Sequence, residues 1–375
     1  MEVRPGYKQT EVGVIPQDWE TPSIIEVAPK IIDYRGRTPR KLGMDWGGGE
    51  IAALSARNVK MGFIDFDEEW NLGSEALYKR WMTNGDTERG DIVFTTEAPL
   101  GNVALIPDDQ RYILSQRTIL LKTDPARAYS PFLFQLMLSD GFQELLAENA
   151  SGSTAQGIQR KKFETLRVAC PPLPEQRAIA AALSDADAAL AGLDRLIAKK
   201  RDLKQAAMQQ LLTRQTRLPG FQGEWEVKRL GDLGAFLKGS GVKKDESRSG
   251  DLPCIRYGEI YTHHTDCIKS FNSWISTDVA RTATRMKPGD LLFAGSGETK
   301  AEIGKCVAFV HDCEAYAGGD IVILRPVGVD SLFMGYYCNT SRINAQKAGK
   351  GQGDAVVHIS AAALSMRFDD AAGAC

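Results

Sequence analysis

The sequence predicts an α+β protein with two pseudo-repeated, mixed α/β domains separated by a long coiled-coil-type helix. Three observations indicate this fold class. Short segments of the first half recur in the second half, brief apolar runs follow Gly-Asp turns, and one central segment shows heptad spacing of its apolar residues. The length of 375 residues suits two or three domains.

Four pairs of segments carry the internal repetition, and they keep the same order at an offset of roughly 200 residues. A period of that length indicates a duplicated domain, because solenoid repeats are only about 20–50 residues long. The paired segments are 18–20 with 224–226, 89–94 with 287–293, 115–121 with 318–324, and 152–157 with 351–354.

Within each copy the pattern mixes short strands with helices. The apolar runs at 92–94 and 119–121, and those at 291–293 and 321–324 in the second copy, are typical of buried strands. The segment 131–146 begins with a proline and carries spaced apolar residues, which favours a helix. Each copy is therefore expected to be a mixed α/β domain.

A different kind of segment lies between the copies. The run PPLP at 171–174 stiffens the chain, and a helix is expected from 175 to about 212. At ~1.5 Å per residue this helix is about 55 Å long, which exceeds the ~34–36 Å that usually separates paired half-sites on duplex DNA. Its apolar seam needs a partner, either another helix of this chain or another protein. The seam consists of Ile179, Leu183, Ala186, Leu190, Leu193, Ile197, Leu203 and Leu211.

The net charge of −2 does not indicate nucleic-acid binding, but the charges are unevenly distributed. Residues 30–41 contain five basic side chains and one acidic one, and residues 199–248 contain twelve basic and six acidic ones. These runs are permissive evidence, because a basic run is commonly just a solvated face. No apolar run reaches the roughly 20 residues of a spanning helix and no secretory signal is present, so a cytoplasmic protein is expected.

The seven cysteines are irregularly spaced and form no C-x-x-C pair, so neither a disulfide framework nor a zinc ribbon is expected. His263, His264 and Cys267 could ligate a metal together with Cys254 or Cys313. A polar turn beside ordinary thiols explains them more simply. No metal and no cofactor is therefore expected.

Residues 171–180 (PPLPEQRAIA), followed by the long helix, resemble the specificity subunit of type I restriction-modification systems. Residues 13–19, 255–260 and 289–305 also look typical of it, so the resemblance covers about residues 8–365. It implies that each copy is a target recognition domain that reads one half of a bipartite sequence in double-stranded DNA. It also implies a non-catalytic chain, whose helix docks methyltransferase (modification) subunits, two of them by expectation, and which restriction (endonuclease) subunits join.

The resemblance gives the domain boundaries. The first target recognition domain is expected at 1–170, the spacer helix at 171–215, the second target recognition domain at 216–365 and an atypical C-terminal tail at 366–375. Family members of this length normally carry a second Pro-rich opening and helix after the second domain. None follows Ser365. The hypothesis is a truncation that leaves the apolar seam half uncovered.

Base edges are read by Arg, Asn, Gln, Lys, Ser and Thr, and phosphates are held by Lys, Arg and backbone amides. The loop 35–41 is favoured in the first copy because its Gly and Pro residues expose the arginines. His358 follows two valines, which indicates a packed histidine. The predicted DNA-contacting residues are Arg35, Arg37, Arg40, Lys41, Arg57, Asn58, Gln116 and Arg117 in the first copy, and Lys243, Lys244, Arg256, Tyr257, Ser296, Thr299, Lys350 and Gln352 in the second.

Two alternative functions stay open. Asp290, Glu298 and Lys300 imitate the metal-binding pattern of a metal-dependent nuclease. The first copy keeps Asp91 without such a lysine, so a turn common to both copies explains Asp290 more simply. A protein-interaction scaffold without nucleic acid is the other alternative. A methyltransferase is not expected, because its N-P-P-aromatic or D-P-P-aromatic tetrad and its glycine-rich cofactor loop do not occur.

Overall fold

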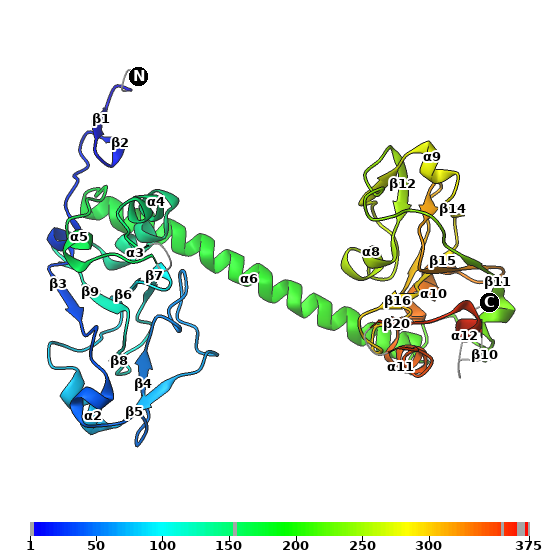
Figure 1. The fold of residues 1–375 in the computed structure, drawn as a ribbon, viewed down its shortest axis with the longest axis horizontal. Coiled ribbons are helices and arrows are strands. Elements are labelled where there is room, and N and C mark those ends of the chain that lie inside the picture. Colours follow the sequence, from blue (N-terminus) through cyan, green and yellow to red (C-terminus); the bar gives the residue numbers. More distant parts are fainter. Residues whose placement is uncertain (1–3, 153–155, 354–355, 366–371, 374–375) are drawn as a thin grey trace. The chain divides into compact units, whose positions relative to one another are not determined.

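The computed structural model describes residues 4–152, 156–353, 356–365 and 372–373. The chain divides into two compact units, Met1–Asp194 (unit 1) and Arg195–Cys375 (unit 2), and the long helix α6 (Leu173–Leu212) contributes residues to both. Each described apolar core lies within one unit (Figure 1). Among the described residues, no helix combines the length and apolarity that crossing a membrane requires.

A four-stranded antiparallel sheet in the order β3-β9-β6-β7 forms the centre of unit 1. Side chains of successive strand residues point to opposite faces. Ile92 and Phe94 accordingly join one core while Val93 joins another. Because both faces of the sheet are covered, residues 92–94 of β6 and 119–121 of β9 are continuously apolar rather than alternating. The strands are β3 (Lys30–Asp33), β6 (Ile92–Thr96), β7 (Leu100–Leu105) and β9 (Thr118–Lys122).

A second, three-stranded sheet of unit 1 has the order β5-β4-β8, with β4 antiparallel to β5 and parallel to β8. The fully buried Trp81 packs in the core beside it, and its Nε1 donates a hydrogen bond to the Leu114 carbonyl at 2.8 Å. The elements in and around this second sheet are η1 (Pro39–Leu42), β4 (Ile51–Leu54), β5 (Asn71–Gly73), α2 (Glu75–Trp81) and β8 (Ile113–Leu114).

The helices of unit 1 supply the core on the other face of the four-stranded sheet. The C-terminal part of the predicted helix at 131–146 is a separate helix, because Ser139 ends one helix and caps the next through its side chain. The remaining elements of unit 1 are β1 (Tyr7–Thr10), β2 (Gly13–Pro16), α1 (Ile24–Val27), α3 (Ser130–Leu138), α4 (Asp140–Glu148) and α5 (Arg160–Glu164).

Unit 2 repeats this strand pairing. Its antiparallel sheet has the order β11-β19-β15-β17, and its second sheet has the order β13-β12-β18-β14, with β12 antiparallel to β13 and parallel to β18. The predicted fold class, two similar mixed domains with a long helix between them, is therefore confirmed. The strands are β11 (Gly234–Lys238), β12 (Leu252–Ile255), β13 (Ser273–Ile275), β14 (Thr284–Arg285), β15 (Leu291–Ala294), β17 (Cys306–Ala308), β18 (Tyr316–Ala317) and β19 (Ile321–Pro326).

Short helices and two-stranded pairs complete unit 2. Helix α10 packs on β17, as α3 packs on β7 in unit 1. The remaining elements are β10 (Glu226–Val227), α7 (Leu230–Leu233), α8 (Tyr257–Thr262), α9 (Thr277–Ala280), β16 (Ser296–Gly297), α10 (Ser331–Tyr337), α11 (Ser341–Ala348), β20 (Val357–His358), α12 (Ala361–Ser365) and β21 (Ala372–Gly373).

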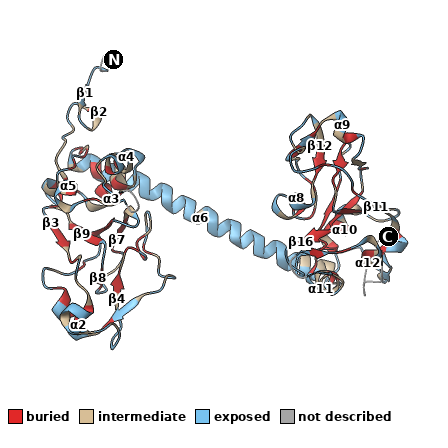
Figure 2. Cartoon of the chain, in the orientation of Figure 1, coloured by how far each residue is buried: buried red, intermediate tan, exposed pale blue. Residues whose placement is uncertain are grey.

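Helix α6 is continuous over its 40 residues. Most of it is exposed (Figure 2). The predicted apolar seam lies on this exposed helix: Leu190 and Leu193 have 61% and 55% of their surface accessible. Only Ile179 and Leu211, at its two ends, are partly covered. The seam therefore leaves a strip of large apolar side chains uncovered within this chain.

Candidate nucleic-acid interface

Two of the loops that connect the two sheets lie at equivalent places in both units. In unit 1, residues 34–50 join β3 to β4 and residues 115–117 join β8 to β9. In unit 2, residues 239–251 join β11 to β12 and residues 318–320 join β18 to β19. Most of the predicted basic residues of the first copy, and Lys243 and Lys244 of the second, lie in these loops. The duplication therefore places a long loop with exposed lysine or arginine side chains at the same point of the fold in both units.

The short connecting loops also share an unusual backbone conformation. Arg117 and Asp320 occupy equivalent positions, directly before β9 and β19, with φ angles of 68° and 57°. Left-handed backbone is uncommon for residues other than glycine. The carbonyl of each then accepts a hydrogen bond from the neighbouring strand end, at 2.9 Å from the Thr96 amide and at 2.7 Å from the Gly295 amide. Both turns are thus fixed by the same bond.

Three of the predicted residues hold the 34–50 loop in shape. Arg35 binds the Asp33 carboxylate through Nε and Nη2, at 3.0 and 2.7 Å. Burial acts to raise the pKa of Asp33, but the hydrogen bonds and charge of Arg35 outweigh it and lower that pKa below its usual value. Arg37 stacks on the Tyr34 ring at 4.8 Å and donates to the Trp81 carbonyl. Lys41 donates to the Gly36 carbonyl at 2.7 Å.

Other predicted residues of unit 1 differ in their availability. Asn58 is fully buried, and its side chain accepts from the Ser55 hydroxyl at 2.7 Å, so its assignment to DNA contact is wrong. The side-chain oxygen of Asn58 thus closes the turn at residues 55–58. Arg57 and Arg117 are exposed but face the carboxylates of Glu69 and Glu97, at 3.3 and 3.5 Å. Arg40 and Gln116 are exposed and form no hydrogen bond or ion pair with any described residue.

In unit 2, Lys243 and Lys244 are exposed, and their side chains likewise have no partner in the described part of the chain. Tyr257 is exposed, while the Nε of Arg256 contacts the buried Glu259 carboxylate at 3.3 Å. Thr299 is exposed and donates to Glu302 at 3.3 Å. Ser296 is buried in β16, so a direct contact of its hydroxyl with DNA is wrong; the hydroxyl instead bonds Nδ1 of His358 at 2.9 Å.

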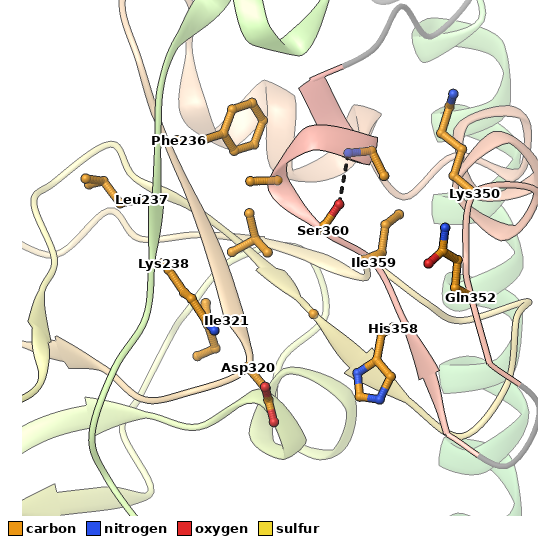
Figure 3. A pocket seen from close by; sticks show the side chains of 14 residues that line it. Phe236, Leu237, Lys238, Asp320, Ile321, Lys350, Gln352, His358, Ile359 and Ser360 are labelled. Atoms are coloured by element: carbon orange, nitrogen blue, oxygen red, sulfur yellow. Dashed lines mark hydrogen bonds between the residues drawn. The ribbon is translucent and has the colours of Figure 1, made fainter.

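Figure 3 shows a cavity of about 460 Å³ in unit 2. Lys350, Gln352 and His358 come from one segment on one side of it, and Lys238 and Asp320 come from β11 and the turn before β19. His358 is exposed, which corrects its expected packing; the pattern of β20 buries Val357 instead. The predicted Lys350 and Gln352 therefore line the same cavity as Lys238 at the end of β11.

Sequence reasoning missed Lys238 and His358 in this cavity. Unit 1 has a comparable cavity of about 390 Å³, lined by Arg35, Glu97 and residues 157–160. Lys238 could have been found by aligning the two copies. It is the last residue of β11, and Arg35 lies two residues after the end of β3, the equivalent strand of unit 1. In the paired repeat segments 152–157 and 351–354, residues 153–155 and 354 lie outside the described residues.

Asp290, the centre of the nuclease alternative, has a structural role. Its fully buried carboxylate binds Nε and Nη2 of Arg325, both at 2.8 Å, and accepts the Lys287 amide at 2.8 Å. Asp91 repeats this in unit 1 with Lys122 and the Glu88 amide, again at 2.8 Å each. Glu298 and Lys300 are exposed and have no bond to Asp290. The nuclease alternative is therefore not supported.

The residues of the weaker metal alternative do not gather. Within the described part of the chain, no three His, Cys, Asp or Glu side chains are grouped as metal ligands would be. His264 is buried, whereas Cys313 is exposed.

Residues 16–199 match the family described as Type I restriction modification DNA specificity domain. Two curated proteins of Methanocaldococcus jannaschii are similar to the chain. The type I restriction enzyme MjaIX specificity subunit is 24% identical over 322 residues, which cover 79% of this chain and 70% of that protein. The MjaX specificity subunit is 23% identical over 242 residues, which cover 60% of this chain and 55% of that protein.

The fold is shared with a chain from a solved structure of the type I R-M system, determined to explain complex assembly and conformational transition. The TM-score is 0.56 at 20% identity, and the match covers 93% of this chain and 85% of that one. At this identity the likeness concerns the fold: two sheet-rich domains and the long helix.

Proposed function

Because residues 16–199 match the family of type I restriction modification DNA specificity domains, we propose that this chain is the DNA sequence-specificity subunit of a type I restriction-modification complex. The observation that carries the proposal is the duplicated junction between the two sheets. In each unit it presents a loop with exposed lysine or arginine side chains next to a short turn of fixed conformation. Two such junctions suit a bipartite target, one half-site for each unit.

The proposed division of labour follows the predicted boundaries. Residues 1–170 and 216–365 are the two target recognition domains, and residues 171–215 are the spacer. The proposed tail, 366–375, lies outside the described residues except for 372–373. The chain itself recognises the target sequence on double-stranded DNA in the cytoplasm, and its partner subunits carry out catalysis. The chain covers only 55% of the MjaX relative, so these assignments rest on the site rather than on that relative's whole length.

Helix α6 is the proposed docking element for the modification subunits, two of them, with restriction subunits joining the assembly. Its exposed strip of leucines supports this, because single exposed apolar residues are common but a continuous strip marks an interaction site. The matched test compares two double variants, Leu190→Gln with Leu193→Gln and Ala188→Gln with Ala191→Gln. Positions two residues apart lie on opposite sides of a helix. Only the leucine variant is expected to lose its partner.

The proposal is tested by co-purifying the full chain with its modification subunit and sequencing the sites that the complex methylates. We expect one bipartite sequence, and binding that weakens as salt rises, because Lys and Arg contacts to phosphates release counterions. Methylation at the same sites without this chain would overturn the proposal. The absence of salt-dependent DNA binding would also overturn it, because that result fits a scaffold that contacts no nucleic acid.

A further inference from the structure

A second cavity of unit 1 lies where the 34–50 loop, the start of β5 and the 115–117 turn meet. Its volume is about 510 Å³. The sequence pointed to three residues of its lining, Arg37, Arg40 and Gln116, but not to the rest. The polar and aromatic lining also includes Asp45, Trp46, Asn71 and Ser115.

Three of the lining side chains are unengaged, whereas Arg37 and Trp81, which also line the cavity, donate to the carbonyls of Trp81 and Leu114. Arg40, Asn71 and Gln116 are exposed, and none of their side chains forms a hydrogen bond or ion pair with any described residue. The neighbouring arginines contrast with them, since Arg35 and Arg117 each have a carboxylate partner. Charged and amide groups converging without partners on one cavity are groups left available for a ligand.

The frame that carries these groups is rigid. The Trp46 ring lies 5.6 Å from that of Trp81, which is fully buried and bonded to the Leu114 carbonyl. Asn71 is paired in register with Ala53 of β4. Gln116 sits in a three-residue turn whose next residue is fixed by the Thr96 amide. Free side chains on a fixed frame suit recognition, because little conformational entropy is lost on binding.

The chemistry of the lining favours bases over phosphates. A side-chain amide offers one donor and one acceptor side by side, which matches N7 and N6 of adenine in the major groove. Asp45 also lines the cavity, is exposed and has no partner among the described residues. A carboxylate repels phosphate, but it can accept from the N4 amino group of cytosine. A cavity with two amides and a carboxylate therefore suits base edges.

We propose that Asn71 and Gln116 are specificity-determining residues, whose amides read A·T base pairs in the half-site of unit 1. This inference rests on the proposed function and names the part of unit 1 that discriminates sequence. Arg40 lines the same cavity and contributes the positive charge that draws the duplex to it.

The test uses the full chain and a pool of duplexes with a randomised central segment. Bound duplexes are selected and sequenced for the wild type, for Asn71→Ala and for Gln116→Ala. Gln110→Ala is the matched control, because Gln110 is an exposed glutamine of unit 1 outside the cavity lining. Each cavity variant is expected to relax A·T positions in one half of the enriched motif only. Its affinity for the wild-type duplex should fall about 5- to 150-fold, the range for a lost bidentate base contact.

Gln116→Glu provides a second, shape-preserving variant. A carboxylate cannot donate to adenine N7 but accepts from cytosine N4, so the relaxed position is expected to shift from A·T toward C·G. An unchanged motif in all three variants would overturn the inference and leave the proposed function standing. Equal loss on every duplex would also overturn it, since that is the behaviour of a phosphate contact. If the wild type enriches no motif, the proposed function itself fails.

Discussion

His264 is a single residue whose burial has a consequence that can be measured. Only 4% of its surface is exposed, and its Nε2 has no hydrogen-bond partner within the described residues. Glu259, His263 and Lys305 are the ionisable groups around it, and Lys305 donates to the His264 carbonyl at 2.7 Å. Burial is the largest effect and lowers the pKa of His264 below its ordinary value of 6.5. The folded chain thus holds this imidazole neutral.

The unfolding free energy should therefore fall as the pH drops. The unfolded chain takes up a proton at His264 near pH 6.5, whereas the folded chain takes it up only at lower pH. The contribution is present above pH 6.5 and is lost below it, at a slope of at most about 1.4 kcal/mol per pH unit for one proton. We expect His264→Leu to reduce this slope in urea titrations between pH 7 and 5. His263→Leu, at an exposed neighbour, should keep the wild-type slope; equal slopes in all three proteins would contradict the assignment.

Sequence patterns at this scale identify residue types but not their partners. The arginine-rich loop 35–41 was predicted as a DNA-contacting surface. Arg35, however, donates to the Asp33 carboxylate, and Arg37 donates to the Trp81 carbonyl. The Trp81 carbonyl lies 44 residues further along the chain, so its proximity to Arg37 depends on the tertiary fold. Asn71 was missed for the same reason, because nothing in its local sequence tells that its side chain borders the 115–117 turn.

At the scale of elements, the start of helix α6 is fastened to unit 1 by one amide. Gln176 is fully buried, and its Oε1 accepts the Tyr129 amide at 2.8 Å. Its Nε2 donates to the carbonyls of Pro171 and Arg127, at 2.8 and 3.0 Å. The preceding residue, Glu175, accepts from the Trp19 indole at 3.1 Å on the surface. The P-L-P-E-Q segment thus begins the helix and also fixes it.

Gln176→Leu is expected to destabilise unit 1 by about 2–4 kcal/mol, because it removes three hydrogen bonds to backbone groups, one of them buried and two partly buried. Glu175→Ala removes only the exposed bond to Trp19 and should cost less than about 1 kcal/mol. Chemical unfolding of the two variants, compared with the wild type, measures the difference. If the two variants were equally stable, Gln176 would not be the fastening residue.

The helix itself was predictable to within a few residues, since heptad spacing and high helix propensity are both local. Its anchor was not, because the partners of Gln176 are backbone atoms of residues 127–129. The exposed seam had the converse outcome. Its residues lie on the exposed helix, but whether another chain covers Leu190 and Leu193 is a property of an assembly rather than of this sequence.

Across the whole molecule, the repeated Gly-Asp turns show that the duplication extends to interactions. Asp91 and Asp290 each accept the amide three residues earlier and pair with a cation on the adjacent strand, Lys122 or Arg325. The sequence predicted the shared turn, but the cations, on β9 and β19, became partners only through the strand order. Each pair lies in a different unit, and each described apolar core belongs to one unit.

Two units with separate cores should unfold in two transitions, and the duplicated pairs offer a matched way to identify them. Asp290→Ala leaves Arg325 without its carboxylate partner and is expected to lower the unfolding free energy of unit 2 by about 3 kcal/mol. This corresponds to a transition temperature lower by roughly 6–12 °C. Asp91→Ala should lower the other transition by less, because Lys122 keeps Glu88 at 3.0 Å. Differential scanning calorimetry of the full chain separates the two effects. The double variant should show both shifts, each in its own transition and as large as in the single variant, because the two substitutions act independently. A single transition that both substitutions move equally would mean that the two units unfold as one cooperative body.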